Sequence, residues 1–352
     1  MKIDVINANH LTEPLVSAWS KIQSASFAYS NPSFCPEFTQ AIAKVRDDVE
    51  VGVMVSNDQP VGFFPFQRSP NNAALPVGSV LTDMHGFIVA DDIPWSADWL
   101  LRECGLVAWE FDHLVASQHQ FEPYFKCVED SPYMDLSHGY DEYIKERKRA
   151  SASTIKRARA KSRKIEREVG PLRFTLHDSN PEMFSQIIQW KRQQLAEMNY
   201  VDMYKSEWVI NALQEICTVQ THNFSGIIST LHAGDQLVAA MIGMQTPQVI
   251  SSWIPTYNTA FSKYSPGMLL HLEQAKFAAD LGIQRIDLGR GLNQMKTSLG
   301  SASIPVALGA IDCRPLNRLI RHCWYKARNL IHESPLNEFS LRYYRRARRW
   351  LT

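Results

Sequence analysis

Side chains suited to proton transfer and charge neutralisation gather around a short apolar run at residues 285–288. Asp287 lies within this run, and Arg290 and Lys296 follow it closely. A carboxylate at the end of a predicted strand can face a cleft and hold or deprotonate an amine, and a lysine can neutralise negative charge. Tyr257, at the end of the preceding predicted strand, could also neutralise charge. The structural alternatives are a turn-capping carboxylate for Asp287 and a packed aromatic ring for Tyr257.

A loop with the sequence Ser265-Pro266-Gly267 leads into a predicted helix. The first N–H groups of a helix lack intrahelical partners and lie at the positive end of its dipole, so they can bind a phosphate. The glycine lets the backbone approach that group closely. The sequence equally fits a plain helix start, with Ser265 as the N-cap and Pro266 at the first helical position. We predict a cofactor site made by Lys263, Ser265, Gly267, Met268 and Arg290.

Further polar candidates lie outside this segment. Asp83 and His85 share a predicted loop that ends in a glycine, and a histidine beside a carboxylate can exchange protons near neutral pH. Asp112 lies next to His113 on a predicted strand, and we expect Asp112 to be the polar candidate and His113 to lie at the edge of the core. A loop histidine that satisfies the local backbone is the alternative for His85.

Lys191 and Gln194 are three residues apart on a predicted helix, so they share one face. Both side chains could therefore reach the sugar or phosphate of a substrate. The alternative is a helix face that is only solvated.

Several motifs with characteristic spacing occur in the chain. Those in the second half are Trp190-Lys191-Arg192-x-Gln194, Phe224-x-Gly226, Gly234-Asp235-Gln236-Leu237-Val238-Ala239-Ala240, Trp253-x-x-x-Tyr257, Tyr264-Ser265-Pro266-Gly267, and Asp287-Leu288-Gly289-x-Gly291 with Lys296. Those in the first half are Phe64-Pro65-Phe66, Asp83-x-His85-Gly86 and Asp135-Leu136-Ser137-x-Gly139. Together they resemble the CelD/BcsL-type acyltransferases of exopolysaccharide gene clusters, which belong to the GNAT superfamily and are similar in layout to Fem-type peptidyltransferases. The resemblance is best over residues 140–310, and Met295 stands where that family usually has a tyrosine.

The resemblance implies transfer of an acyl group, most simply acetyl, from coenzyme A to an amine. The implied acceptor is an amino sugar or another amine-bearing precursor of exopolysaccharide, free or lipid-linked, with an O-linked acceptor as an alternative. Asp287 would hold or deprotonate the amine, and Tyr257 or Lys296 would neutralise the leaving thiolate. Backbone N–H groups near residues 251–253 would meet the oxyanion, and Trp253 would contact the substrate.

Two other functions remain open at this stage. One is a Fem-like transferase that takes its donor from aminoacyl-tRNA, the only reading under which we expect a nucleic-acid partner. The other is a non-catalytic scaffold of a polysaccharide synthesis complex. Stabilisation by coenzyme A but not by tRNA would separate the first alternative from the acyl-coenzyme A reading.

The elements that must position these residues repeat one order in the two halves. Residues 49–55 and 61–67 predict a hairpin, followed by a helix at 95–107 and a strand at 109–114. Residues 224–231 and 237–244 predict a second hairpin, again followed by a strand, a helix and a strand. This order predicts an α/β fold with two GNAT-like lobes, each a twisted mixed sheet split at its middle. Because only the second half has the Ser-Pro-Gly loop, we expect one cofactor site there.

We therefore divide the chain into four parts. Residues 1–140 form a degenerate structural and substrate-binding lobe, residues 141–170 a basic arm, residues 171–315 the catalytic lobe, and residues 316–352 basic and aromatic helices. The basic run at 145–167 is rich in helix formers, with sparse apolar positions, and predicts a solvated helix. Contact with anionic lipid is the alternative for this arm, and the aromatic and cationic residues of 341–351 suit a membrane surface better.

Composition excludes several other classes of protein. The 352 residues are 45% hydrophobic and 21% charged with a formal net charge of +1, as in a folded globular protein. The six cysteines lack zinc-site spacing, so we expect no metal, and the reduced thiols of a cytoplasmic protein. The sequence contains no P-loop, no GxSxG elbow, no HExxH and no GxGxxG dinucleotide motif.

Overall fold

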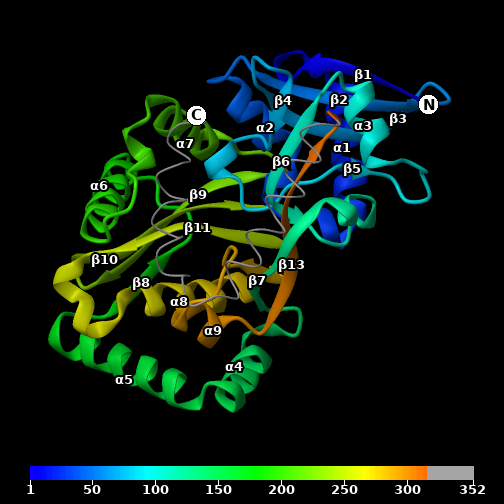
Figure 1. The fold of residues 1–352 in the computed structure, drawn as a ribbon. Coiled ribbons are helices and arrows are strands. Elements are labelled where there is room, and N and C mark those ends of the chain that lie inside the picture. Colours follow the sequence, from blue (N-terminus) through cyan, green and yellow to red (C-terminus); the bar gives the residue numbers. More distant parts are fainter. Residues whose placement is uncertain (315–352) are drawn as a thin grey trace, which may run out of the picture.

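The computed structural model describes residues 1–314, and the ribbon in Figure 1 shows two lobes joined through one sheet. The elements of the first half follow one another in this order: β1 (Lys2–Asn7), α1 (Glu13–Ala25), α2 (Pro36–Ala43), β2 (Val49–Ser56), β3 (Gln59–Arg68), β4 (Ala73–Leu75), β5 (Ile88–Val89), α3 (Ala97–Glu103), β6 (Ala108–Val115) and β7 (Phe125–Asp135). Short 3-10 helices connect several of them, among them η4 (Ser79–Leu81) and η5 (His119–Tyr124).

The second half begins with two consecutive helices and then repeats the plan of the first. Its elements are α4 (Gly139–Ala150), α5 (Ala152–Glu168), β8 (Leu172–Thr175), α6 (Glu182–Glu197), α7 (Glu207–Thr218), β9 (Ser225–Ala233), β10 (Gln236–Gln245), β11 (Val249–Tyr257), α8 (Pro266–Asp280), β12 (Arg285–Asp287), α9 (Gln294–Leu299) and β13 (Ala302–Asp312). The 3-10 helices η6 (Met203–Lys205) and η7 (Thr259–Tyr264) precede α7 and α8. In both halves a strand, two helices and a hairpin lead through a further strand to a helix and two final strands, so the predicted α/β fold with two lobes of like plan is confirmed.

The two lobes exchange their last strands within this sheet. The strand order is β1-β2-β3-β4-β6-β13-β7-β12-β11-β10-β9-β8, with β5 paired to β3. The last strand of the second lobe, β13, pairs antiparallel with β6 of the first, and β7 of the first lobe pairs antiparallel with β12 of the second. The two exchanged strands also pair with each other. Each lobe therefore completes the sheet of the other.

Helices from both halves cover the sheet and divide the buried side chains into three clusters. On one face, α1 and α2 of the first lobe and α6 and α7 of the second contribute to one continuous apolar cluster, in which α2 contacts α7. On the opposite face, α4, α5 and α8 cover the second lobe (Figure 1), and α3 packs on the first. The cluster that spans both lobes and the strand exchange bind the two halves into one unit.

Both hairpins expected from the sequence are present, as β2–β3 and β9–β10. The helix expected at 95–107 is shorter, because the Ser96 side chain caps its start and Gly105, with a positive φ of 65°, ends it. The single helix expected at 145–167 is interrupted at Ser151, whose backbone is not helical. Its first part begins earlier, at Gly139, so that α4 and α5 form two successive helices below α8 in Figure 1.

Within residues 1–314 no helix combines the length and the apolar character needed to cross a bilayer. The basic and aromatic helices predicted for residues 316–352 lie outside the described residues.

Candidate active site

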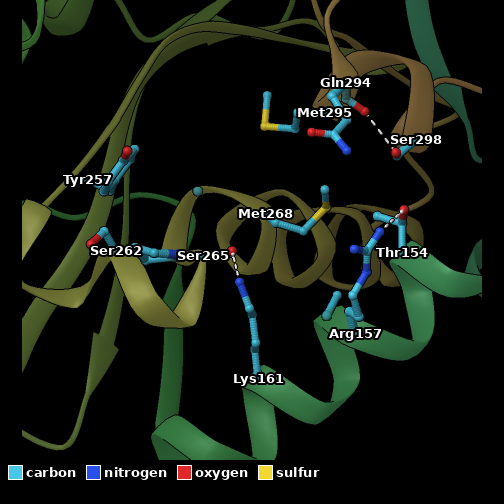
Figure 2. Close-up of a pocket in the computed structure, with 13 residues that line it drawn as sticks. Thr154, Arg157, Lys161, Tyr257, Ser262, Ser265, Met268, Gln294, Met295 and Ser298 are labelled. Carbon is cyan, nitrogen blue, oxygen red and sulfur yellow. Dashed lines mark hydrogen bonds between the residues drawn. The ribbon is translucent and has the colours of Figure 1, made fainter.

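A cavity of about 370 Å³ opens at the N-terminus of α8. Figure 2 shows its walls: α8 and the loop before it, α5 opposite them, and α9 above. The lining residues are Thr154, Arg157, Ala158, Lys161, Tyr257, Ser262, Ser265, Pro266, Gly267, Met268, Gln294, Met295 and Ser298. None of these is an acid, so the cavity is cationic.

The start of α8 presents backbone donors to this cavity. Ser265 has a left-handed backbone, with φ 55°, which turns the chain from η7 into the helix, and Pro266 occupies the first helical position. The carbonyl oxygen of Ser265 accepts the N–H groups of Met268 and Leu269. The N–H of Gly267 has no acceptor among the hydrogen bonds of the described residues, and a Cβ at Gly267 would meet only Tyr257, at 3.7 Å. A phosphate could therefore approach this turn closely.

The two cations in the cavity come from α5, which we expected to be a solvated arm. Lys161 Nζ donates to the side-chain oxygen of Ser265 over 2.5 Å, so Ser265 does not use its side chain to cap the helix. Within residues 1–314, Arg157 donates only to Ser153 and Thr154 of its own helix. Neither cation forms an ion pair with a carboxylate among the described residues. Figure 2 shows both side chains directed from α5 toward α8.

Sequence reasoning missed Thr154, Arg157 and Lys161 as cavity residues. They are spaced three and four apart on α5, which places them on neighbouring turns of one helix side. The buried residues Ile155, Ala158 and Ile165 of the same helix face α8 and the sheet. That sparse apolar stripe was the signal in the sequence that α5 packs against the second lobe.

Of the residues predicted to bind a cofactor, Ser265, Gly267 and Met268 line the cavity, as does Tyr257, which we expected to be catalytic. Lys263 does not line it. Its Nζ lies 3.7 Å from a carboxylate oxygen of Glu168 and 4.7 Å above the ring centre of Tyr264, so its charge is directed to these two residues.

Arg290 is also placed away from the cavity. Its Nη1 donates to the carbonyl oxygen of Asp112 over 2.6 Å, and its Nε lies 3.5 Å from Glu129. It therefore bridges to β6 and β7 of the first lobe. The positive charge expected of Lys263 and Arg290 at the cavity is supplied instead by α5.

Strand β11 has an open edge beside the cavity. It pairs in parallel with β12 only from Val249 to Ser251, although it continues to Tyr257. Opposite Gly243 its register with β10 shifts, and a Cβ on Gly243 would lie 2.7 Å from the carbonyl oxygen of Ser251. The sheet thus splits beyond Ser251, as the predicted fold requires. Backbone groups of β11 in this split are available to an extended ligand.

Asp287 does not face an open cleft, which corrects our expectation. It is 2% exposed, and its Oδ1 lies 2.7 Å from Nε of the equally buried Arg285. Its Oδ2 accepts hydrogen bonds from Arg285 Nη2 over 3.1 Å and from Asn31 Nδ2 over 2.7 Å. The Arg285 guanidinium also stacks on the rings of Phe27 and Tyr133. A carboxylate held in this way anchors β12 to the first lobe. Asp287 is the last residue of β12, and its side chain is too buried there to contact a substrate.

A second polar group gathers at Gly289, where the two lobes meet. Lys296 Nζ donates to the carbonyl oxygens of Gly289 and Arg290, each over 2.9 Å. Asp83, from the first-lobe loop between η4 and β5, accepts a hydrogen bond from Ser251 Oγ over 3.4 Å. Burial lowers the pKa of Lys296, opposed by the negative charge of Asp83. Helix α9 separates this group from the cavity, since Gln294, Met295 and Ser298 of the same helix line the cavity.

His85 and Asp112 lie behind this group. Burial lowers the pKa of His85 to about 3, so the ring is neutral, and its Nε2 accepts the backbone N–H of His113 over 3.3 Å. Burial would raise the pKa of Asp112, but a hydrogen bond from His113 and the charges of nearby cationic groups bring it to about 2. The His113 ring nitrogen lies 3.0 Å from Asp112 Oδ1. His85 joins its loop to β6 through backbone bonds as well, which matches the structural alternative for this residue.

The remaining substrate-binding candidates come from α6 and β11. Lys191 Nζ donates to the carbonyl oxygen of Pro255 over 3.2 Å, and burial and the charge of Lys296 lower its pKa. The side-chain oxygen of Gln194 is buried and lacks a hydrogen-bond partner among the described residues. Trp253 packs edge-on against Phe38 of α2, with ring centres 6.5 Å apart, so it contributes to the core shared by the lobes.

The described residues contain no group of three or more His, Cys, Asp or Glu side chains arranged to hold a metal ion. A second hollow, between α6 and α7, is lined by residues that include Arg192, Asp202 and Tyr204. Arg192 and Asp202 are paired there over 2.9 Å. Polar and charged side chains therefore gather on the two sides of α9, with a cationic cavity on one side and an acid and a lysine on the other.

Comparisons with known proteins agree with this arrangement. Residues 152–297, from α5 to α9, match the family described as acetyltransferase (GNAT) domain. Comparison with curated protein sequences found no significant match. Among solved structures, FemX is similar with a TM-score of 0.57 and 10% identity, over 90% of this chain and 99% of FemX.

Two further structures have the same fold. The C-terminal domain of an Agrobacterium fabrum protein described as a lysylphosphatidylglycerol synthetase is similar. Its TM-score is 0.53 at 11% identity, over 88% of this chain and 94% of that domain. A conserved protein of unknown function from Bacteroides thetaiotaomicron has a TM-score of 0.52 and 9% identity, over 87% of this chain and 99% of that protein. At these identities the likeness describes the fold alone.

Proposed function

We propose that this acyltransferase, whose residues 152–297 form a GNAT domain, takes its acyl group from coenzyme A and transfers it to an amine. The donor is most simply acetyl-coenzyme A. The observation that carries the proposal is the cavity at the start of α8, which has two unpaired cations and no acid among its described lining residues.

Coenzyme A matches that cavity in charge and size. Its pyrophosphate and 3′-phosphate are anionic, and the N-terminus of α8 with Lys161 and Arg157 offers backbone donors and positive charge. A cavity of about 370 Å³ lies in the range of small-molecule sites, and can hold the phosphate-bearing part of the donor. The pantetheine arm would follow the open edge of β11 beyond Ser251 toward the lobe junction.

Residues of the chain can supply the chemistry of acyl transfer at that junction. Backbone N–H groups of β11 near residues 251–253 would stabilise the oxyanion as the amine attacks. Lys296, at the end of the same path, would neutralise the thiolate that leaves. Tyr257 lines the cavity at the end of β11, which fits contact with the donor better than proton transfer at the acyl carbon.

For the acceptor, we propose an amino sugar or another amine-bearing precursor in exopolysaccharide assembly, free or lipid-linked. The support is the sequence resemblance to the CelD/BcsL type described above. On this proposal the enzyme works in the cytoplasm, with peripheral contact to the membrane surface when the acceptor is lipid-linked.

A Fem-like donor, aminoacyl-tRNA, is the second candidate, favoured by the basic helix α5. The cations of α5 that line the cavity, however, face α8 in a cavity of about 370 Å³, the size of a small-molecule site. A tRNA would instead use a wide exposed cationic surface, to which the outer side of α5 could contribute but which the cavity does not provide.

Thermal unfolding with coenzyme A tests the donor. At one hundred times its dissociation constant, a ligand adds about 2.7 kcal/mol, which raises the melting temperature by several degrees. We expect this increase in the wild type and in Lys156→Glu, because Lys156 lies on the exposed side of α5. We expect it to be lost in Lys161→Glu and in Gly267→Glu, which place an acid in the cavity. The two α5 variants carry the same change of charge five residues apart.

The alternatives predict different results in the same assay. Stabilisation by tRNA and not by coenzyme A would support the Fem-like donor. No stabilisation by either ligand would overturn the donor proposal, and the non-catalytic scaffold would be the remaining alternative. Equal stabilisation of Lys156→Glu and Lys161→Glu would show that coenzyme A binds elsewhere.

A further inference from the structure

A loop of the first lobe reaches the point where the sheet of the second lobe splits. Asp83 of this loop accepts a hydrogen bond from Ser251 Oγ over 3.4 Å. Ser251 is the last residue of β11 that pairs with β12, and its partner there is Asp287. The Asp83 carboxylate therefore lies where the acyl end of a donor held along β11 would arrive.

Gly289 leaves a space between Asp83 and the lysine of α9. Its φ of +76° favours glycine, and a Cβ built there would lie 3.6 Å from Lys296 Nζ and 3.7 Å from Asp83 Oδ1. Any side chain at this position would thus enter the space between the acid and the lysine. Among the described residues, Lys296 Nζ does not lie within 4.0 Å of a carboxylate oxygen of Asp83, so the two form no direct ion pair. A Cβ-sized group at this point would be in ordinary van der Waals contact with both.

The surroundings of Asp83 favour a carboxyl that can take up a proton. Burial raises its pKa, and the nearby charge of Asp287 acts in the same direction. The positive charges of His113 and Lys296 and the hydrogen bond from Ser251 act against this rise. Tyr204, in η6, is also near enough to respond to Asp83: burial and the charges of Asp202 and Asp83 raise the pKa of its hydroxyl. Asp287, by contrast, is held by Arg285, whose Nε lies 2.7 Å from Oδ1, and by hydrogen bonds from Arg285 and Asn31 to Oδ2.

We propose that Asp83, supplied by the first lobe, is the catalytic base that accepts the proton of the acceptor amine. The inference rests on the proposed function and adds the group that performs its proton transfer. In the step, the neutral amine nitrogen forms a bond to the thioester carbonyl carbon, and its proton passes to the Asp83 carboxylate. The carbon–sulfur bond breaks, and its electron pair leaves on the sulfur beside Lys296. The sulfur then takes up a proton by way of solvent, and Asp83 returns its own to solvent.

This assignment also gives the first lobe a direct role in catalysis. That lobe has no Ser-Pro-Gly loop of its own, yet it supplies the base from the loop at residues 82–86. The reaction centre is then built from both lobes, and the acceptor is a primary amine that enters at their junction.

Asp83→Asn tests the proposal, since it keeps the shape and removes the basic oxygen. The assay follows release of the coenzyme A thiol from acetyl-coenzyme A with glucosamine as the acceptor probe. Removal of a general base lowers the rate by about 10²- to 10⁴-fold, and we expect such a loss of kcat/KM. Asp91→Asn, an exposed acid of the same lobe, is the matched control and should retain the wild-type rate.

The pH dependence of kcat/KM distinguishes a catalytic base from a residue that only supports the structure, because only a base would add an acid limb to the profile. In the wild type kcat/KM should fall in acid as Asp83 is protonated, at a pH above the ordinary value of 3.8. In Asp83→Asn this acid limb should be absent, and the rate should rise with pH until the free amine dominates.

Coenzyme A binding, measured separately by the melting temperature, keeps the two proposals distinguishable. Equal rates for wild type and Asp83→Asn, at whatever level, would overturn the role of Asp83, even where coenzyme A binds both proteins. Failure of coenzyme A to raise the melting temperature of the wild type would instead overturn the donor proposal. A melting temperature of Asp83→Asn equal to that of the wild type would show that the variant is folded.

Discussion

Asp83 and Asp287 both neighbour Ser251 of β11, and the residues around them give the two carboxylates different properties. Asp287 has a guanidinium and an amide within hydrogen-bond distance, whereas Asp83 has only a serine hydroxyl. Charge partners therefore decide which carboxylate is free to exchange a proton. The strand position alone had favoured Asp287.

Removal of Asp287 should chiefly cost stability. In Asp287→Ala the Arg285 guanidinium, 2% exposed, would be left buried without a counter-ion. Loss of one partner of such a pair costs about 3–5 kcal/mol, and we expect a loss of this size in urea unfolding. The double variant Arg285→Met with Asp287→Ala should recover part of it, because no charge is then left unpaired. A loss below about 1 kcal/mol in the single variant would contradict the buried pair.

At the scale of the element, α5 illustrates how few apolar residues can dock a helix. Ile155, Ala158 and Ile165 are buried against α8 and the sheet, although the rest of the helix is mainly Lys, Arg and other polar residues. Docking of this narrow stripe directs Lys161 and Arg157 into the cavity (Figure 2). The sequence suggested a solvated arm because most of the surface of α5 is indeed exposed.

Weakening this contact should impair coenzyme A binding without a change at the cavity itself. Ile165 is fully buried one turn from Lys161, and Ile165→Ala should lower the free energy of unfolding by about 2–5 kcal/mol. Because α5 then packs less firmly, the coenzyme A dissociation constant should rise as well. Arg163→Ala, on the exposed side of the same helix, should change neither quantity. An unchanged dissociation constant in Ile165→Ala would show that α5 is not required to hold the cations in place.

At the scale of the whole molecule, the exchange of β7 and β13 makes one folding unit of two lobes. Each lobe lacks a strand that only the other half of the chain supplies. The apolar cluster of α1, α2, α6 and α7 crosses the same boundary. Separation of the lobes would expose both the sheet edges and this cluster.

Division of the chain between β7 and α4 should therefore abolish independent folding. We expect residues 1–137 and 138–352, expressed singly, to lack a cooperative unfolding transition by circular dichroism. Co-expressed, they should form a complex that elutes at the size of the intact chain. A cooperative transition in either fragment alone would contradict the interdependence that the strand exchange implies.

The sequence by itself determined the α/β class, the tandem plan, both hairpins and the Ser-Pro-Gly start of α8, because these follow from local periodicity and turn chemistry. It also placed Ser265, Gly267, Met268 and Tyr257 in one region, since they are close along the chain. Only the tertiary structure decided the rest. The exchange of final strands, the pairing of Asp287 with Arg285 and Asn31, and the approach of Lys161 and Asp83 to the second lobe join residues far apart in sequence. Such contacts depend on how whole elements pack, and no local pattern records them.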